Sequence, residues 1–344
     1  MTATVPVNTT EPVNVVEPVN GAVPMNGAVP VNDAAPVGSK LAPALTLSVV
    51  VPAFNEQEVI GECLRRLVAQ GDAITEIVVV DNNSTDDGMQ VVAQWAQQYP
   101  HIRMVSESTQ GLVFARNRGL DSATGDLIAR IDADTRVGEE WASTIIEFFT
   151  ADTDERWAAL CGRGEAYGVP FAGKFDKWKI RVHPLKQLTG KNRSVAVGDV
   201  PATDVAVTEL PVLYGSNMIL RRATWQQIRD RVSMRRTVFE DVDMGLCVQD
   251  IGGRNAFLSS LTVGVSPRRM ESGVASFVRY MSFLPRTFAL HRRYGFALGA
   301  GAVYVPALTV LHAARLVALR TYDVESGRFD PRNLLRAKPD RILP

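Results

Sequence analysis

The chain has few cysteines and histidines, and their spacing argues against two common kinds of structural support. It contains 3 cysteines and 4 histidines in 344 residues, and no Cys-x-x-Cys pair occurs. We therefore expect neither a zinc site nor a disulfide framework. Widely spaced cysteines are typical of a reducing compartment, and the N-terminus lacks the basic start and continuous apolar core of a secretion signal. These features predict a cytoplasmic protein.

The chain also lacks an excess of charge of either sign, which argues against a nucleic-acid partner. Lys plus Arg and Asp plus Glu number 37 each, so the formal net charge is +0. The cations are nevertheless concentrated between Lys174 and Arg193 and between Arg268 and Arg293. Phosphate groups or an anionic membrane surface are the expected partners of such basic regions. The hydrophobic content of 46% is ordinary for a globular protein with a real core.

The first 40 residues lack aromatic side chains and repeat with a period of six. Proline recurs at every sixth position from Pro6 to Pro36. Regular proline prevents a helix and the interior of a sheet, and the segment has little apolar surface to bury. We therefore predict a disordered, extended arm over residues 1–40.

Between residues 45 and 150, apolar runs alternate with helical stripes. This alternation predicts an α/β fold with a parallel, doubly wound sheet. The expected strands cover residues 45–51, 74–80, 101–106 and 127–131, and the expected helices include residues 56–70 and 112–123. In such sheets ligands bind beyond the carboxyl ends of the strands. The polar loops at Asn55, Asp81 and Asp132 all fall at that edge.

Two carboxylates follow the strand that ends before Asp132. Asp132 and Asp134 are one residue apart, where the strand becomes a loop. Oxygen ligands of this kind suit Mg²⁺ or Mn²⁺, which commonly also hold substrate phosphates. The alternative is a solvated turn, because Asp is a common turn residue. The neighbouring polar loops favour the metal interpretation.

The pattern after residue 150 is looser. We expect strands at 157–166, 212–220 and 256–265, the second containing Gly215, and a helix that begins near Glu240. Residues 296–311 carry no charge. Pro306 and several glycines lie in this run, and arginines flank it. A helix hairpin packed on the domain or lying in the membrane interface is therefore favoured over a spanning helix at 296–319.

Five ordered blocks of sequence resemble family-2 glycosyltransferases of the GT-A fold. The blocks are Val51-Pro-Ala-Phe-Asn-Glu56, Val79-Val-Asp-Asn-Asn-Ser-Thr-Asp86, Gly111 with Ala115-Arg-Asn-Arg-Gly119, Asp132-Ala-Asp134, and Glu240-Asp241. The resemblance implies a mostly parallel, Rossmann-like sheet flanked by helices over residues 41–268. Residues 45–150 would bind the nucleotide sugar, and residues 151–268 the acceptor. Residues 269–344 would form a helical, membrane-associated extension.

The resemblance also implies roles for individual residues. The nucleotide sugar, UDP- or GDP-linked, would contact Pro52, Ala53, Asn55, Glu56, Asp81, Asn83, Gly111, Arg116, Asp132, Ala133, Arg268 and Arg269. Asp134 and Asp132 would hold Mn²⁺ or Mg²⁺. Asp241 would be the catalytic base, with Glu240 orienting the acceptor and Asp243 in reserve. Gly215, Ser216 and Asn217 would shape the acceptor side.

Each of these roles has a structural alternative. Glu56 could be a helix N-terminal carboxylate, Asn83 a turn former and Arg116 part of a solvated helix face. Gly215 could mark a bulge, and Asp241 could be a helix-starting acid with no catalytic part. The family's late histidine ligand is missing from Val265-Ser-Pro-Arg-Arg269. Arg268 or Arg269 would then hold the diphosphate directly.

The implied reaction is inverting, metal-dependent transfer of a sugar to an acceptor hydroxyl or lipid phosphate. Ser276-Phe-Val-Arg-Tyr280 lacks the Gln and Trp of processive synthases, so a non-processive enzyme is expected. The basic regions and apolar C-terminus suggest a lipid-linked acceptor at the cytosolic face of the membrane. The competing hypotheses are a sugar-1-phosphate nucleotidyltransferase and a catalytically inactive nucleotide-binding scaffold.

Overall fold

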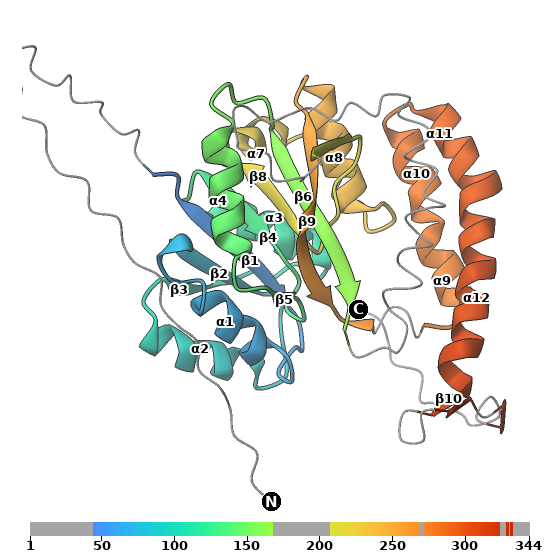
Figure 1. The fold of residues 1–344 in the computed structure, drawn as a ribbon, viewed down its shortest axis with the longest axis horizontal. Coiled ribbons are helices and arrows are strands. Elements are labelled where there is room, and N and C mark those ends of the chain that lie inside the picture. The colour runs from blue at the N-terminus through green and yellow to red at the C-terminus, as the bar shows by residue number, and fades with distance from the viewer. Residues whose placement is uncertain (1–43, 168–206, 268–271, 324–327, 330, 333–344) are drawn as a thin grey trace, which may run out of the picture. The chain divides into compact units, whose positions relative to one another are not determined.

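The structure is a computed structural model that describes residues 44–167, 207–267, 272–323, 328–329 and 331–332 (Figure 1). The described residues all belong to one compact unit. The predicted arm at 1–40, most of the basic segment at 168–206, and Arg268 and Arg269 lie outside the described residues.

Four parallel strands form the first half of the sheet, as the alternating pattern predicts. They are β1 (Leu47–Ala53), β2 (Glu76–Asp81), β3 (Ile102–Ser106) and β4 (Leu127–Arg130), in the order β3-β2-β1-β4. Every residue of β1 is buried, because helices cover both faces of the sheet. Strands buried on both faces need the near-continuous apolar runs that this sequence supplies.

Two apolar clusters occupy the two faces of this sheet. Leu47, Val49 and Val51 of β1 pack on one face with α1 (Ile60–Val68), α2 (Gly88–Gln98) and α4 (Trp141–Ala151). Val50 packs on the other face with α3 (Leu112–Ser122), α7 (Arg222–Ile228) and α8 (Glu240–Asp250). Successive side chains of a strand point to opposite faces, so one apolar run serves both clusters.

The second half of the sheet is mixed in direction. Beyond β4 the order continues β8-β6-β9-β5, and β7 also pairs with β9. The neighbours β4 and β8 run antiparallel, as do β8 and β6, whereas β6 and β9 are parallel. These strands are β5 (Arg136–Val137), β6 (Ala159–Ala166), β7 (Val207–Leu210), β8 (Met218–Arg221) and β9 (Asn255–Val265). The predicted α/β class is confirmed, and the parallel arrangement applies to its first half.

Two predicted boundaries differ from the structure. The helix expected from Glu56 begins at Ile60, after a turn in which the Glu56 carbonyl accepts hydrogen bonds from the backbone of Val59 and Ile60. The strand expected from residue 212 begins at Met218, so Gly215 lies in the turn before β8. In both cases polar contacts at the sheet edge hold the backbone outside the regular element.

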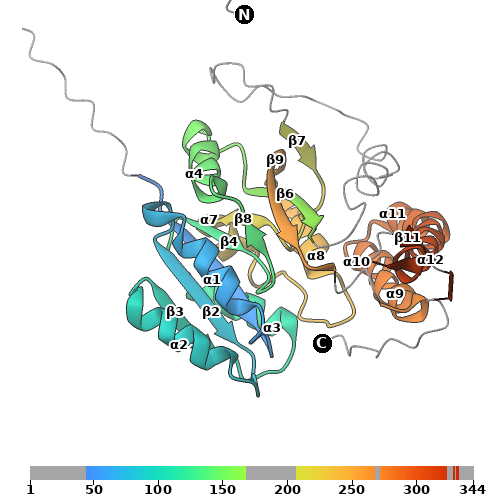
Figure 2. The same cartoon turned by 60° about the horizontal axis from the view of Figure 1, so that its bottom comes forward.

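The C-terminal region is a helical hairpin. One arm contains α9 (Val274–Met281) and α10 (Phe283–Leu290), and the other contains α11 (Tyr294–Gly299), the π-helical segment η3 (Ala300–Tyr304) and α12 (Val305–Thr321). α10 packs against α11, and α9 packs against α12, so the arms are antiparallel (Figure 1). Figure 2 shows these helices grouped to one side of the sheet. The short strands β10 (Tyr322–Asp323) and β11 (Arg328–Phe329) follow.

The chain reverses at Arg292, and not within the apolar run. Arg292 has a left-handed φ of 57°. Pro306 is the second residue of α12 and has no backbone N–H to donate, and the π-helical segment η3, a local irregularity of the helix, lies directly before it. By length and composition, Tyr294–Ala318 is one described helix apolar enough to cross a membrane, and its most apolar window is only 11% buried. This criterion is weak evidence for a membrane helix on its own.

The first arm of the hairpin packs on helix α8. Leu284 and Phe288 of α10 share an apolar cluster with Val242 and Leu246 of α8. The buried Thr287 hydroxyl accepts a hydrogen bond of 2.9 Å from the backbone N–H of Phe239, the residue before α8. The position of α8 therefore depends on the hairpin.

Candidate functional site

The loops after β1 and β2 form one surface at the carboxyl edge of the sheet. Asn55 and Asn83 both adopt left-handed backbone, with φ of 53° and 63°. The Asn55 side-chain oxygen accepts a 2.8 Å hydrogen bond from the Thr85 N–H, and the Ser84 hydroxyl accepts one of 3.2 Å from the Asn55 N–H. Asparagine tolerates this conformation better than most residues. Asn83 therefore forms part of a turn, and its contact with the nucleotide sugar stays a prediction.

Asp81 is the last residue of β2, and one of its oxygens accepts a 3.0 Å hydrogen bond from the Ser84 N–H. The next residue, Asn82, is buried and was not singled out from the sequence. Its amide donates to the carbonyls of Glu107 and Thr109 and accepts from the N–H of Gly111. Asn82 therefore joins the loop after β2 to the loop after β3. The sequence feature that could have indicated a role for Asn82 is its position beside Asp81 in the polar loop.

Arg116 is the centre of the site. Its side chain is only 3% exposed, and its guanidinium lies 2.5 Å from the Asp132 carboxylate and also pairs with Glu240. It is therefore not part of a solvated helix face. The carboxylates of Asp132 and Glu240 keep 28% and 22% of their side-chain surface exposed. Arg116 links the acid after β4 to the acid that begins α8.

Arg130 is a second buried arginine, at the end of β4, that sequence reasoning missed. It is 0% exposed, donates a 3.1 Å hydrogen bond to the carbonyl of Gly215, and lies 3.6 Å from Glu240. The sequence feature that could have indicated a buried arginine here is a single cation within a short apolar strand. Because buried charges need partners, its position ties the Gly215 turn to the same acidic group.

Asp241 is held by the turn before β8. One of its oxygens accepts a 3.0 Å hydrogen bond from the Gly215 N–H, and the other accepts one of 2.9 Å from the Val242 N–H. A Cβ on Gly215 would lie 2.5 Å from the Arg130 guanidinium and 3.2 Å from the Asp241 carboxylate. Glycine at 215 thus permits close approach of two charged side chains, in a turn and not in a strand or bulge.

Asn217 does not reach a substrate with its side chain. It is 0% exposed, accepts a hydrogen bond from the Trp141 indole N–H, and donates to the carbonyl of Leu261. The expected acceptor contact of this side chain is therefore corrected to a structural one. Ser216, between Gly215 and Asn217, remains partly exposed.

Asp132 and Asp134 lie where metal ligands were predicted, directly after β4. The backbone turns there, because the Asp132 N–H donates to the Thr135 hydroxyl and the Thr135 N–H returns to the Asp132 carbonyl. Both aspartates are partly exposed, and the Asp134 carbonyl accepts a 3.1 Å hydrogen bond from the Tyr167 hydroxyl. Within the described ranges no third His, Cys or acidic group joins this pair at ligating distance.

The donor set therefore fits a hard divalent cation. Two carboxylates at an open strand end suit Mg²⁺ or Mn²⁺, which keep several positions for water and substrate phosphate. The remaining predicted contacts, Pro52, Ala53, Glu56 and Ala133, line the same edge: the first two end β1, and Ala133 is buried between the aspartates.

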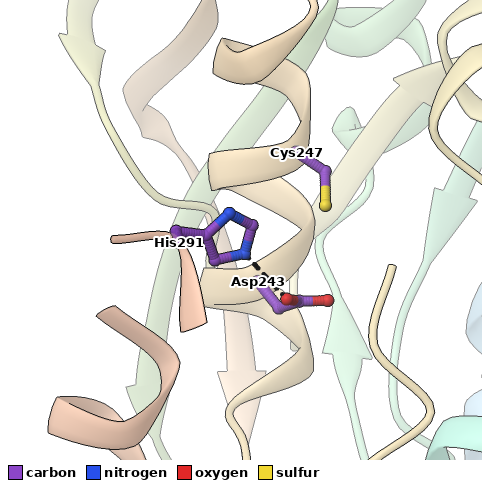
Figure 3. A group of neighbouring side chains, drawn as sticks. All are labelled: Asp243, Cys247 and His291. Atoms are coloured by element: carbon purple, nitrogen blue, oxygen red, sulfur yellow. Dashed lines mark hydrogen bonds and ion pairs between the residues drawn. The ribbon is translucent and has the colours of Figure 1, made fainter. Parts of the chain in front are cut away.

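A second cluster of polar groups lies between α8 and the hairpin (Figure 3). The His291 ring nitrogens lie 2.8 Å from Asp243 and 3.0 Å from Asp250. The hydrogen bond with Asp243 raises the pKa of His291, burial opposes this, and Asp250 adds to the rise. Cys247 is on the same side of α8, and burial raises the pKa of its thiol to about 12.

The fold is that of the GT-A glycosyltransferases. It is similar to a mannosyltransferase from Pyrobaculum calidifontis, solved in complex with GDP-mannose and Mn²⁺, with a TM-score of 0.53 over 85% of this chain and 78% of that one. The sequence identity is 21%, so this similarity concerns the fold alone. The chain belongs to glycosyl transferase family 2, whose family model matches residues 48–223, about half of the sequence.

Curated relatives match a shorter stretch of the chain. The chain is 32% identical over 106 residues to the uncharacterized glycosyltransferase YibD of Escherichia coli, covering 31% of each chain. It is 35% identical over 114 residues to an undecaprenyl-phosphate 4-deoxy-4-formamido-L-arabinose transferase of Sodalis glossinidius, covering 31% of this chain and 35% of the relative. The match thus spans about a third of the length of these relatives.

Proposed function

We propose that this protein transfers a sugar from a UDP- or GDP-linked donor to an acceptor, with inversion and without processivity. The observation that carries this proposal is the pairing of Arg116 with both Asp132 and Glu240. It brings the acid after the parallel strands next to the acid pair that begins α8. Donor-binding and acceptor-activating groups therefore meet in one place, which transfer between two substrates requires.

The donor would lie along the loops after β1, β2 and β4. Asp81 and Glu56 offer acceptors for base and ribose hydrogens, and Asp132 and Asp134 would hold Mn²⁺ or Mg²⁺. A bound divalent cation stabilises the negative charge that develops on a leaving diphosphate. Arg268 and Arg269 remain predicted diphosphate contacts, outside the described residues.

The acceptor would be activated by Asp241. Its carboxylate lies in the first turn of α8 and is oriented by the N–H groups of Gly215 and Val242. A carboxylate held in this way is suited to accept the proton of an attacking hydroxyl. Glu240 is compensated by Arg116, which suits a positioning role and not proton transfer.

The donor site can be tested by calorimetry with UDP and GDP in the presence of Mn²⁺. Asp134→Ala should abolish metal-dependent nucleotide binding while the circular dichroism spectrum stays that of the wild type. Asp154→Ala is the matched control, because Asp154 is an exposed aspartate outside the site. Unchanged metal-dependent affinity in Asp134→Ala would remove the site assignment.

The reaction class can be tested by the product released. Sugar transfer releases a nucleoside diphosphate, whereas a sugar-1-phosphate nucleotidyltransferase releases pyrophosphate and an inactive scaffold releases neither. The expected product is the nucleoside diphosphate. Pyrophosphate released from a nucleoside triphosphate and a sugar 1-phosphate would favour the nucleotidyltransferase, and no product with any nucleotide sugar that binds would favour the inactive scaffold.

The acceptor is proposed to be lipid-linked, with the hairpin in peripheral contact with the cytosolic face of a membrane. The outer face of the second arm exposes Tyr294, Leu298 and Val310 by 68%, 73% and 72%. Arg292 and Arg293 precede this face, and anionic headgroups attract such cations. A helix with an apolar face and flanking cations is typical of interfacial binding.

Vesicle flotation tests the membrane contact. The protein should float with vesicles that contain anionic lipid and less with neutral ones. The double variant Leu298→Glu, Val310→Glu should remain at the bottom of the gradient. Met104→Glu is the control, because Met104 is an exposed apolar residue on β3, away from the hairpin. A wild-type protein that floats with neither kind of vesicle would exclude this part of the proposal.

A further inference from the structure

Three side chains between α8 and α10 form a group with the chemistry of a metal site. Asp243 and Cys247 are four residues apart on α8 and therefore share one face of the helix. His291 follows α10 and turns its ring toward them (Figure 3). One oxygen, one nitrogen and one sulfur of these residues all lie within 4.8 Å of one another.

The distances suit a small cation with mixed ligands. Tetrahedral zinc has bonds of about 2.0–2.3 Å, which place its ligand atoms roughly 3.3–3.8 Å apart. The His291 and Asp243 atoms are 2.8 Å apart and would need to separate slightly, and the Cys247 sulfur lies within 4.8 Å of both. Small side-chain rotations would therefore bring the three ligand atoms to the spacing of a tetrahedral zinc site. Nitrogen, sulfur and oxygen together are the ligand set of zinc and not of Mg²⁺ or Ca²⁺.

The surroundings of these ligands are those that metal-binding residues usually have. The second ring nitrogen of His291 lies 3.0 Å from the Asp250 carboxylate, which can accept its N–H and orient the ring. One oxygen of Asp243 accepts a 2.7 Å hydrogen bond from the Ser233 N–H, and the other oxygen faces His291. Asp243 itself is 1% exposed.

A cavity adjoins the group and leaves room for a further ligand. It has a volume of about 310 Å³ and is lined by Arg231, Ser233, Asp243, Cys247, Asp250, Leu290 and His291. Three protein ligands and one position open to water or an anion make a complete tetrahedral set. Arg231 on the cavity wall favours an anionic or hydroxide fourth ligand.

We infer that Asp243, Cys247 and His291 bind a zinc-class divalent cation that joins helix α8 to the C-terminal hairpin. This site is separate from the pair Asp132 and Asp134, whose ligands are all oxygen. Because two ligands come from α8 and one from the end of α10, the cation stabilises the hairpin against the helix that carries Asp241. The inference does not depend on the proposed sugar transfer.

Cobalt substitution tests the site directly. The full chain, freed of metal with a chelator and kept reduced, is titrated with Co²⁺ in excess Mg²⁺, which occupies oxygen-only sites. We expect one equivalent to produce intense tetrahedral visible bands and a near-ultraviolet thiolate-to-cobalt band, both lost on adding Zn²⁺. Zn²⁺ should also raise the midpoint of thermal unfolding, since it binds the folded state.

Variants identify the ligands. Cys247→Ala should lose the thiolate band, whereas Cys63→Ala should keep it. Cys63 is the appropriate control because it is also buried, and after burial itself the charges of Asp134 and Asp132 contribute most to raising the pKa of its thiol. Asp250→Asn should keep the band and weaken zinc binding about 10- to 100-fold, the usual effect of losing an orienting carboxylate.

Two results would overturn the inference. The first is a wild-type protein that gives no thiolate band with Co²⁺, which would leave His291 as a charged clasp between two carboxylates. The second is a band that survives in Cys247→Ala and disappears in Cys63→Ala, which would place the metal at the other cysteine. If Cys247→Ala does not fold, Asp250→Asn provides the test in its place. Unchanged zinc affinity in Asp250→Asn would count against the site.

Discussion

The two halves of the sheet bring residues to the site in different ways. In the parallel half, each strand delivers a polar loop to the same edge, so Asp81 and Asp132 lie at one edge of the sheet by topology alone. In the mixed half, the position of Gly215 before its strand depends on hydrogen bonds with Asp241 of α8 and with Arg130 of β4. Parallel strands thus gather a site by connectivity, whereas the mixed half needs specific side-chain contacts.

Asp241→Asn should distinguish most clearly between the roles of the two halves. It keeps the shape of the side chain and removes its basicity. Turnover should fall about a hundredfold or more, the usual scale for loss of a general base, while nucleotide affinity stays near the wild-type value. Initial rates of nucleoside-diphosphate release and calorimetry measure the two quantities.

The control for this variant is Asp230→Asn, because the Asp230 side chain is 94% exposed and lies outside the site. It should leave both turnover and affinity unchanged. A wild-type turnover in Asp241→Asn would mean that another residue is the base and that the acceptor half works differently.

Arg116→Met breaks the connection between the halves. It removes the guanidinium that pairs with both Asp132 and Glu240, and leaves Glu240 with Arg130 at 3.6 Å. Removing one partner of a buried ion pair costs about 3–5 kcal/mol, but these two carboxylates still reach water, so we expect a loss of about 2 kcal/mol in the free energy of unfolding. Denaturant unfolding measures this loss.

Arg65→Met is the matched control on an exposed pair. Arg65 bonds Glu62 at 2.7 Å with its side chain 56% exposed, and exposed ion pairs contribute little to stability. Equal losses in the two variants would show that the Arg116 contacts do not hold the halves together.

Glu76 offers a test confined to the parallel half, at the edge opposite the site. Burial acts to raise the pKa of Glu76, but hydrogen bonds from Ser48, Thr124 and Arg103 outweigh it, so the pKa lies below its ordinary value. A carboxyl whose pKa is lowered by folding stabilises the fold above its unfolded pKa, about 4.3, and loses that contribution as the pH falls through the folded pKa.

Glu76→Gln should therefore cost about 1–2 kcal/mol at neutral pH, the scale of hydrogen bonds to a charged group. The difference from the wild type should stay constant above about pH 5 and shrink below about pH 4. Unfolding by denaturant at several pH values measures it. A difference that grows with acidity would contradict the stated direction of the pKa shift.

Deletion of residues 2–38 should have the smallest effect, because the repeat has little to bury in either half. The melting temperature and turnover should stay close to those of the full chain. Differential scanning calorimetry and rate measurements test this expectation. A large loss of either would show that the arm packs on the enzyme, contrary to its composition.

Much of the parallel half was predictable from the sequence. The apolar runs placed the four strands, and the polar residues after them placed the loops at Asn55, Asp81 and Asp132. The burial of Arg116 was not predictable, because its two acidic partners are 16 residues away in one case and on a distant helix in the other. The sequence placed Asn217 among the residues of the acceptor side. Its side chain is instead hydrogen-bonded to Trp141 and Leu261, which come from other segments of the chain.

The sequence by itself determined the elements and the chemistry of the strand-end acids, because apolar periodicity and the order of blocks are local properties of the chain. Only the tertiary structure decided which charges are paired. Cysteine spacing argued against a zinc site, because no Cys-x-x-Cys pair occurs in the chain. Folding brings His291, 48 residues from Asp243, to within 2.8 Å of it. Such a pairing depends on how the hairpin packs on α8, and no local pattern of residues contains that information.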